Sequence, residues 1–235
     1  MNSDISFYSS RGGRVVNQDS VKVLKSGDRV LIAAADGMGG TAGGEVASET
    51  AVRSVAESLS DSLLSADLLY DAVIRANKAV LQCAQDRSPR TTLSVLWFDR
   101  EQALAANIGD TRIYQFRSGG IRFQSVDHTV AQMSVMAGEL AKEEIRSSRE
   151  RFQLIQALGS EDGLRVDLQD LDILEGDAFL ICTDGFWEYV VEEEMLSDLG
   201  RSADTRQWLE LMKARVTGRL PDRADNHSAA AIMIS

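Results

Sequence analysis

The hydrophobic and polar positions of this chain fall into strand-like and helix-like blocks. Short apolar runs of strand length lie at residues 4–10, 19–24 and 29–35. In the next two stretches an apolar residue returns about every fourth position, which is typical of an amphipathic helix that covers a sheet with one face. The first stripe consists of Ala47, Ala51, Val55, Leu59 and Leu63, and the second of Leu69, Val73, Ala76, Val80 and Ala84.

The second half of the chain returns to strands and then ends in helices and one more strand. Strand-like runs occupy residues 91–99, 102–109, 111–117, 121–126, 164–173, 178–183 and 228–234, whereas 129–158, 192–199 and 204–218 are helical. Strands and helix pairs form separate blocks instead of alternating strictly, which favours packed antiparallel sheets flanked by helices. Without a repeat, low-complexity tract or linker, we interpret the chain as one unit.

Composition and charge narrow the class of protein. The 235 residues are 44% hydrophobic and 26% charged, as in ordinary globular proteins. A net charge of −11 argues against a general nucleic-acid binder, which needs a basic surface. No apolar run approaches the roughly 18 residues of a membrane span, and the N-terminus lacks a signal-peptide pattern. Cys83 and Cys182 lack metal-ligand spacing, so we expect reduced core thiols in a cytoplasmic protein.

Four apolar strands carry an aspartate at or just beyond one end. Asp36, Asp110 and Asp184 follow such runs, each with a neighbouring glycine, and Asp225 precedes the last one. Any one of them alone is better explained as a turn residue. Should the four ends converge, however, several carboxylates share a small volume and cannot all ionise without a cation among them.

The residue types indicate which cation. The chain has only two histidines, His128 and His227, and no suitably placed cysteine, so a zinc site is disfavoured. Carboxylates with a backbone carbonyl suit Mg²⁺ or Mn²⁺. Two such ions bridged by one carboxylate can lower the pKa of a shared water and hold an in-line phosphoryl displacement. Asp36, with the Gly37 carbonyl beside it, is the natural bridging ligand.

Other chemistries fit the sequence less well. Residues 37–42 match the loose dinucleotide pattern G-x-G-x-x-A, but the acid expected about 20 residues later falls inside a helix. No Gly-Lys-Ser/Thr and no G-x-S-x-G occurs, so a Walker loop and a serine-hydrolase elbow are both absent. Cys182 lies within an apolar strand, where a thiol stays protonated and inert.

Six segments in order across most of the chain carry a resemblance to one known family. They are GGRVVNQDS (12–20), ADGMGG (35–40), TTLSVLWFD with ALAANIGDTRIYQFR (91–117), the stretch from VDHTV to ALG (126–159), ICTDGFWEYV (181–190) and DRADNHSAAAIMI (222–234). This pattern resembles the metal-dependent serine/threonine protein phosphatases of type 2C, the PPM family, in a minimal bacterial form. TDGFWEYV is also similar to phosphatases that accompany type VI secretion kinases.

The resemblance implies a fold, a reaction and partners. The fold would be α+β, a four-layer α-β-β-α sandwich of two antiparallel sheets flanked by helix pairs. One catalytic domain would span 1–235, with a flap at about 129–158. The enzyme would hydrolyse phosphoserine and phosphothreonine by direct attack of a metal-bridging hydroxide, using two Mn²⁺ or Mg²⁺ ions and a third. Its partners would be phosphorylated proteins, targets of a bacterial serine/threonine kinase, and we expect a signalling monomer with no nucleic-acid or membrane partner.

The resemblance also implies the metal ligands. Asp36 matches the aspartate that bridges two metals, and Gly37 matches the residue that lends its carbonyl to the first. Asp184 and Asp225 match the acidic ligands of the second metal. Asp110 matches the aspartate that helps to hold a third metal in bacterial members.

The resemblance assigns roles to two residues that do not bind metal, and two other positions differ from the usual family residues. Asp19 matches the acid that orients metal-bound water, and Arg14 matches the arginine that grips the substrate phosphate, as a guanidinium fork can. Gln18 stands where the family usually has glutamate. Met38 stands where many eukaryotic members have the histidine that acts as general acid, so the proton donor is unidentified. His128 is one candidate donor, with a structural role as the alternative.

Two other functions stay open at the level of sequence. One is a catalytically inactive member of the same fold that acts as a binding module, for which Gln18 is the only supporting feature, and Mn²⁺ calorimetry would discriminate it. The other is a phosphatase for small molecules, which competition between phosphopeptides and small phosphate esters would discriminate. KEEIRSSRER (142–151) is interpreted as a solvated helical face, or, through the resemblance, as a flap segment that selects substrates.

Overall fold

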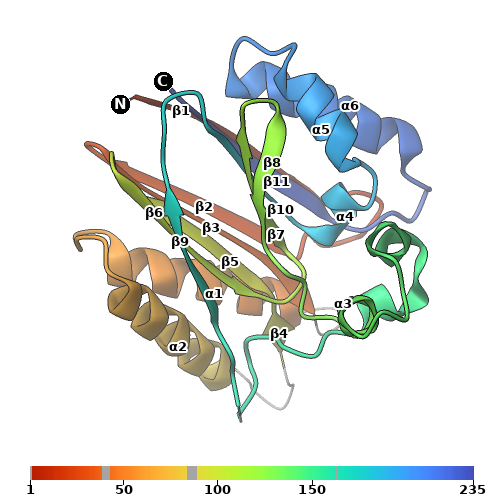
Figure 1. The fold of residues 1–235 in the computed structure, drawn as a ribbon. Coiled ribbons are helices and arrows are strands. Elements are labelled where there is room, and N and C mark those ends of the chain that lie inside the picture. The colour runs from red at the N-terminus through yellow and green to blue at the C-terminus, as the bar shows by residue number, and fades with distance from the viewer. Residues whose placement is uncertain (1, 39–42, 84–88, 162) are drawn as a thin grey trace.

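The computed structural model describes residues 2–38, 43–83, 89–161 and 163–235, and its strands form two antiparallel sheets (Figure 1). One sheet has the order β1-β11-β10-β7-β8; the other has the order β2-β3-β5-β6-β9, with β4 paired to β3. The strands are β1 (Ser3–Ser10), β2 (Asp19–Ser26), β3 (Arg29–Met38), β4 (Arg90–Thr91), β5 (Leu93–Phe98), β6 (Gln102–Ile108), β7 (Arg112–Arg117), β8 (Gly120–Gln124), β9 (Asp167–Asp172), β10 (Ala178–Cys182) and β11 (His227–Ile234).

Helices cover the outer faces of both sheets. The helices are α1 (Gly43–Leu59), α2 (Ala66–Gln82), α3 (Val130–Met136), η1 (Lys142–Ser147), η2 (Arg149–Phe152), α4 (Asp184–Trp187), α5 (Glu192–Leu199) and α6 (Thr205–Arg219). In Figure 1, α1 and α2 lie along the sheet that contains β3, and α5 and α6 lie along the sheet that contains β11. The predicted α+β fold, a sandwich of two antiparallel sheets between helix pairs, is confirmed.

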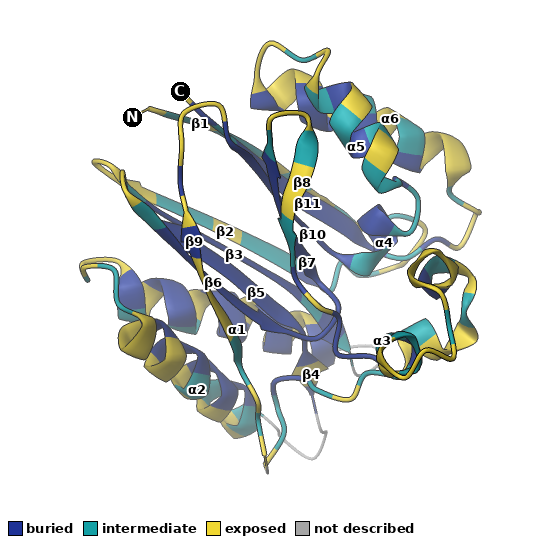
Figure 2. Ribbon diagram, in the orientation of Figure 1, coloured by how far each residue is buried: buried dark blue, intermediate teal, exposed yellow. Residues whose placement is uncertain are grey.

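Alternate side chains of strand β3 pack on opposite faces of its sheet, and both faces are buried. Leu31, Ala33 and Ala35 pack against α1 and α2, whereas Val30 and Ile32 face the core between the two sheets. Because successive side chains of a strand point to opposite faces, a strand buried on both sides has to be apolar at every position. Figure 2 shows the central strands buried and the outer faces of the helices exposed.

The two predicted helical stripes are buried with one exception. Ala47, Ala51, Val55 and Leu59 all lie in the core between α1 and the sheet. Leu63, the fifth member of the stripe, was expected on the same helix, but α1 ends at Leu59 and Leu63 is 77% exposed. The four-residue apolar repeat therefore extends one step beyond the last residue of α1. On α2 the stripe is buried up to Val80, and Ala84 lies outside the described residues.

Both cysteines are free, as the sequence predicts, but only one of them lies in the core. Cys182 is a buried free thiol of β10, and burial raises its pKa, so it stays protonated as predicted. Cys83 is free but only half-buried, so the prediction of a core thiol is wrong there. In the described part of the chain no helix is both long enough and apolar enough to cross a membrane.

The α5–α6 layer leads to a prediction about acid stability. Glu194 accepts hydrogen bonds from Arg219, 2.6 Å, and Arg215, 2.8 Å, and the bonds from Arg219 are the main cause that lowers its pKa to about 2. Since the unfolded chain restores an ordinary pKa near 4.5, this stabilisation is complete above about pH 4.5 and is lost as the pH falls towards 2. Glu194→Gln should therefore show a smaller loss of stability in urea unfolding between pH 5 and pH 3.

The expected difference is about 1 kcal/mol, because Arg219 is half-exposed and solvent screens the pair. Glu193→Gln is the matched control, since Glu193 is exposed on the same helix and has no ion pair in the described structure. Equal acid sensitivity of Glu194→Gln and the wild-type protein would contradict this account.

Candidate active site

Asp19 and Asp36 stand opposite each other where β2 begins and β3 ends. The two residues are paired in the antiparallel register of these strands. The backbone of Asp36 is held from the other side as well: its N–H donates to Thr92 Oγ1, 2.8 Å, and its carbonyl accepts from Thr91 Oγ1, 2.9 Å. The sheet therefore delivers two carboxyl groups to one edge with little freedom in the backbone.

Two more of the predicted aspartates join this edge. Asp184 lies close enough to Asp36 for the charges of the two carboxyl groups to interact, and the charges of Asp19 and Asp110 also act on Asp36. Burial, and then the charge of Asp184, raise the pKa of both Asp36 and Asp110 well above the ordinary value. Burial is also the main cause that raises the pKa of Asp19 and of Asp184 to about 7. The strand ends do converge, and their carboxylates repel one another.

Within the described structure, two carboxyl oxygens of this cluster lack a hydrogen-bond partner, which bears on whether the cluster suits a divalent cation. Asp19 Oδ1 and Asp184 Oδ1 are buried and have no hydrogen-bond partner among the described residues. A buried oxygen without a donor is costly, and a cation removes that cost. Within the described ranges, no three acidic, imidazole or thiol groups are arranged to hold an ion by themselves. An all-oxygen set of one or two carboxylates, a carbonyl and water nevertheless fits Mg²⁺ or Mn²⁺.

Gly37 and Gly44 make the approach of α1 to this edge possible. A Cβ on Gly37 would lie 2.0 Å from the Gly44 carbonyl oxygen, and a Cβ on Gly44 would lie 2.6 Å from the Gly37 carbonyl oxygen and from Gln18 Nε2. Only glycine avoids such collisions with backbone atoms. The glycines therefore serve a close backbone approach beside the predicted ligand carbonyl, and Gln18 packs over them. Residues 39–42, the rest of the glycine-rich loop, lie outside the described residues.

Arg14 and Asp225 form a partly exposed ion pair beside the carboxyl cluster. Arg14 Nη2 donates to Asp225 Oδ2 at 2.7 Å, and both side chains are about half exposed. Asp225 also adds its charge to the environment of Asp19 and Asp184. The predicted phosphate-binding residue therefore lies beside the carboxylates, and one of the predicted metal ligands is its present partner.

Asn226 anchors the loop that carries Arg14, and sequence reasoning gave this residue no role. Its side-chain amide donates to the carbonyls of Arg11, 2.8 Å, and Val16, 3.1 Å, and its Oδ1 accepts from the Gln18 N–H, 2.8 Å. Asn226 is only 3% exposed. The one available signal was its place directly after Asp225 in the segment that carries the family resemblance.

Thr183 and Trp187 hold two of the aspartates from the β10–α4 connection. Thr183 Oγ1 donates to Asp19 Oδ2 at 2.8 Å, which leaves Asp19 Oδ1 directed elsewhere without a partner. Trp187 Nε1 donates to the Asp110 carbonyl at 2.8 Å. Asp184 begins α4, so one short connection carries a predicted ligand and orients two further carboxyl residues.

The sequence leaves the proton donor open, and the two positions in question are those of Met38 and His128. Met38 ends β3 opposite Arg90 and is half-buried. His128 is buried, with Nδ1 near the Gly109 N–H, 3.2 Å, and Nε2 near Asp167 Oδ2, 3.1 Å. Both ring nitrogens are thus engaged by groups of the protein.

The flap residues 142–151 are less solvated than their sequence predicts. Arg146 pairs with Glu192 of α5 at 2.6 Å, and Arg151 pairs with Glu188 at 2.6 Å. Both arginine side chains are less than 20% exposed, and Ile145 is buried. The interpretation as a solvated helical face is confirmed for most of the segment, which is exposed, but is wrong for Ile145, Arg146 and Arg151, because these residues bind the segment to the body of the protein.

Comparisons with known proteins agree with this geometry. The sequence pattern of the family described as Protein phosphatase 2C matches residues 8–219. The serine/threonine phosphatase stp of Listeria innocua is 31% identical over 201 residues, 80% of each chain. Among solved structures, the catalytic domain of the serine/threonine protein phosphatase PstP in complex with two manganese ions has a TM-score of 0.84 at 28% identity, covering 99% of this chain and 98% of that one.

A further solved structure, PppA of Pseudomonas aeruginosa, is described as a key regulatory component of the type VI secretion system. It has a TM-score of 0.84 and 26% identity, and each chain is covered completely. The family match makes the chain a metal-dependent hydrolase of phosphoric esters, and the cluster of carboxyl groups agrees with this class. The chain belongs to the protein phosphatase 2C family, and it is a serine/threonine protein phosphatase.

Proposed function

We propose that the chain, as one catalytic domain over residues 1–235, removes phosphate from phosphoserine and phosphothreonine of proteins in a single step at a divalent metal centre. The observation that carries the proposal is the pooling of buried carboxyl groups from separate strands, with two carboxylate oxygens that lack any described hydrogen-bond partner. Such a cluster is costly in an empty fold and suits bound Mn²⁺ or Mg²⁺.

In this proposal the ligands are those given by the sequence resemblance. Asp36 would bridge two ions, with the Gly37 carbonyl on one side and Asp184 and Asp225 on the other. Asp110 would contribute to a third ion. When bound, the ions supply positive charge for the phosphoryl oxygens and lower the pKa of a shared water.

The remaining work falls to Asp19 and Arg14. Asp19 is held by Thr183 through one oxygen, so its other oxygen is free to orient a water molecule. Arg14 would bind the phosphoryl oxygens with two N–H groups at once, after exchanging its carboxylate partner Asp225 for the substrate. The ion pair with Asp225 holds the guanidinium beside the carboxyl cluster before substrate arrives.

The test uses a phosphothreonine peptide and p-nitrophenyl phosphate with the metal-free protein and added Mn²⁺. Hydrolysis should require Mn²⁺, and a single turnover in ¹⁸O-labelled water should place one labelled oxygen in the released phosphate. A phosphoryl group trapped on the protein would contradict the single step. Failure to bind Mn²⁺ in calorimetry would instead support an inactive binding module.

The substrate class is tested by competition. Phosphopeptides should compete with small phosphate esters at lower concentration than the esters compete with each other. The reverse order would favour a phosphatase for small molecules. The flap segment 142–151, bound to α4 and α5 by Arg146 and Arg151, is the region where we place substrate selection.

The cellular setting is part of the same proposal. We propose a cytoplasmic monomer that opposes a bacterial serine/threonine kinase, with no nucleic-acid partner. The likeness to PppA supports a kinase associated with type VI secretion. Comparison of phosphorylated proteins in a deletion strain and its parent tests this, because targets of the cognate kinase should gain phosphate.

A further inference from the structure

His128 binds both backbone polar groups of Gly109, the residue that precedes Asp110. The His128 backbone N–H donates to the Gly109 carbonyl at 2.9 Å, and the Gly109 N–H donates to His128 Nδ1 at 3.2 Å. His128 lies in the segment between β8 and α3, remote in sequence from the β6–β7 turn that it holds. A single buried residue therefore holds this turn twice, once through its backbone N–H and once through its ring nitrogen.

The turn itself has little room for adjustment. Gly109 has φ of +97°, and a Cβ there would lie 2.6 Å from the Thr92 side chain, so only glycine fits. The next residue, Asp110, has its carbonyl held by Trp187 Nε1 at 2.8 Å. His128 before Asp110 and Trp187 after it fix the backbone from which the carboxyl group projects.

A clamp is needed here because the carboxyl group of Asp110 is repelled by its surroundings. Asp110 is only 5% exposed and experiences the charges of Asp184 and Asp127. Like charges that are not held apart or neutralised move away from one another when the backbone permits. Without the clamp, the Gly109–Asp110 turn would relax away from the other carboxylates in the absence of a cation.

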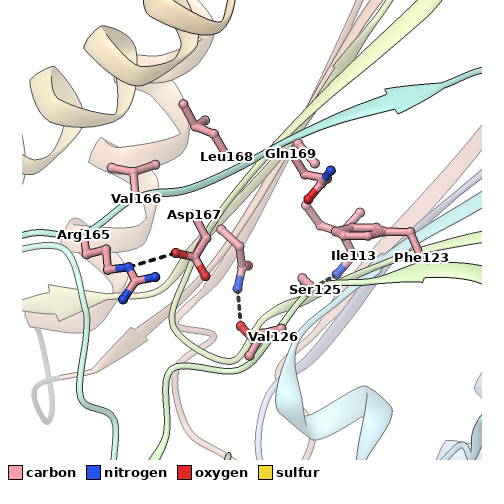
Figure 3. A pocket seen from close by; sticks show the side chains of 11 residues that line it. Ile113, Phe123, Ser125, Val126, Arg165, Val166, Asp167, Leu168 and Gln169 are labelled. Carbon is pink, nitrogen blue, oxygen red and sulfur yellow. Dashed lines mark hydrogen bonds and ion pairs between the residues drawn. The ribbon is translucent and has the colours of Figure 1, made fainter.

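Asp167 completes the arrangement by fixing the ring of His128. Because Nδ1 accepts the Gly109 N–H, the ring proton lies on Nε2, and it donates to Asp167 Oδ2 at 3.1 Å. Asp167 begins β9 and lines a cleft of about 490 Å³, in which Figure 3 shows its ion pair with Arg165. The Nε2 proton thus points to Asp167, so His128 is not arranged as the missing proton donor.

We propose that His128 is a positioning residue that holds the Gly109–Asp110 turn, and through it places Asp110 as a ligand of a divalent ion, with Asp167 fixing its ring. This inference rests on the proposed function, since it assigns Asp110 to an ion. Removing a residue that orients a metal ligand without touching the metal typically lowers metal affinity by about 10-fold to 100-fold. Because His128 acts on the ion only by placing Asp110, we expect saturating metal to restore turnover.

The experiment compares His128→Phe, which keeps an aromatic ring but loses the ring's hydrogen bonds to Gly109 and Asp167, with His128→Asn, which keeps an acceptor close to the Nδ1 position. Mn²⁺ titration calorimetry of the metal-free proteins measures affinity, and amide hydrogen exchange of Gly109 measures the clamp directly. His128→Phe should weaken one Mn²⁺ binding event by about 10-fold and expose the Gly109 amide to exchange. His128→Asn should retain most of both, and excess Mn²⁺ should restore turnover of p-nitrophenyl phosphate.

Asn77→Ala is the matched control, because Asn77 clamps another glycine turn by accepting the Gly159 N–H at 2.7 Å. It should lower thermal stability without changing Mn²⁺ affinity. Asp167→Ala, at a half-exposed position, removes the acceptor of the Nε2 proton; it is a second variant in case His128→Phe does not fold, and it should weaken Mn²⁺ binding in the same direction.

Unchanged Mn²⁺ affinity and unchanged Gly109 exchange in His128→Phe, with tight binding by the wild-type protein, would overturn the inference alone. Equal losses of kcat in the Phe and Asn variants at saturating Mn²⁺ would also overturn it, because they would mark His128 as a proton donor. Absence of Mn²⁺ binding by the wild-type protein would contradict the proposed function, and the inference with it.

Discussion

Replacement of Asp36 by asparagine is expected to reduce phosphatase activity by about a thousandfold, the scale of losing a group on which transition-state charge depends. Asp36 lies in the middle of the carboxyl cluster, with Asp19 across the β2–β3 ladder, and the charges of Asp184 and Asp110 act on it. Asparagine keeps the shape and one oxygen, so the fold and the β3 backbone contacts survive. It removes the charge that we assign to two ions at once.

The same substitution should stabilise the metal-free protein. One of several mutually repelling buried carboxylates is removed, and the melting temperature should rise by about 2–4 °C for each kcal/mol of repulsion relieved. Mn²⁺ should then raise the melting temperature of the wild-type protein but not of Asp36→Asn, because a ligand stabilises only the protein that binds it. Turnover of a phosphopeptide and thermal melting with and without Mn²⁺ measure both effects.

Asp28→Asn is the matched control for this prediction. Asp28 lies before the opposite end of β3 and pairs with Arg100 on the surface. It should leave turnover and the Mn²⁺ effect on melting unchanged. Normal activity in Asp36→Asn would contradict the assigned metal centre.

Replacement of Asn226 by alanine is expected to have the second-largest effect, and it should act on substrate binding. Three hydrogen bonds are lost at a position that is 3% exposed, and the N–H of Gln18 and the carbonyls of Arg11 and Val16 lose a partner. The cost in folding free energy should be about 2–3 kcal/mol, since three hydrogen bonds of a buried side chain are lost at about 1 kcal/mol each. Among its described contacts on this side, the loop that carries Arg14 then keeps only those with Ala224 and Asp225, so it is held less firmly.

Because Arg14 is the group that we assign to the substrate phosphate, loosening its loop should raise KM for a phosphopeptide about tenfold, the factor that corresponds to 1.4 kcal/mol of binding. kcat should change less, since Asp36 and Asp184 are held by other contacts. Steady-state kinetics at 15 °C, where the variant remains folded, measures the two constants.

Asn77→Ala serves as the control for Asn226→Ala, because it also removes a buried amide that ties two segments together. It should cost stability without raising KM. An Asn226→Ala enzyme with lower stability and unchanged KM would show that the residue supports the fold but does not position Arg14.

Much of the fold follows from local patterns in the sequence. The period of two in β3 and the fourfold stripes of α1 and α2 arise from the geometry of strands and helices, so hydrophobicity alone predicts which faces are buried. Leu63 marks the limit of this reasoning, because a stripe does not state where its helix ends. The charges of residues 142–151 mark another, since a segment rich in arginine and glutamate looks solvated until its partners on α4 and α5 are known.

Some properties of the candidate site could also be predicted from the sequence, and others could not. The sequence by itself determined that aspartates follow strand ends, that hard oxygen ligands predominate, and that the chain carries the segments of the phosphatase 2C family. These properties depend on residue type and order, which the chain states directly. The roles of the individual aspartates, of Asp19 and of Arg14 stay predictions until the variants are measured.

Only the tertiary structure decided which side chains meet. It brought Asp184 to Asp36, turned Arg14 onto Asp225, assigned Asn226 to the Arg14 loop, and engaged both nitrogens of His128 with Gly109 and Asp167. These contacts join residues far apart in the chain, and a hydrogen bond depends on positions within a few tenths of an ångström. Local sequence patterns carry no such information, because it arises only when two sheets and their connections are packed together.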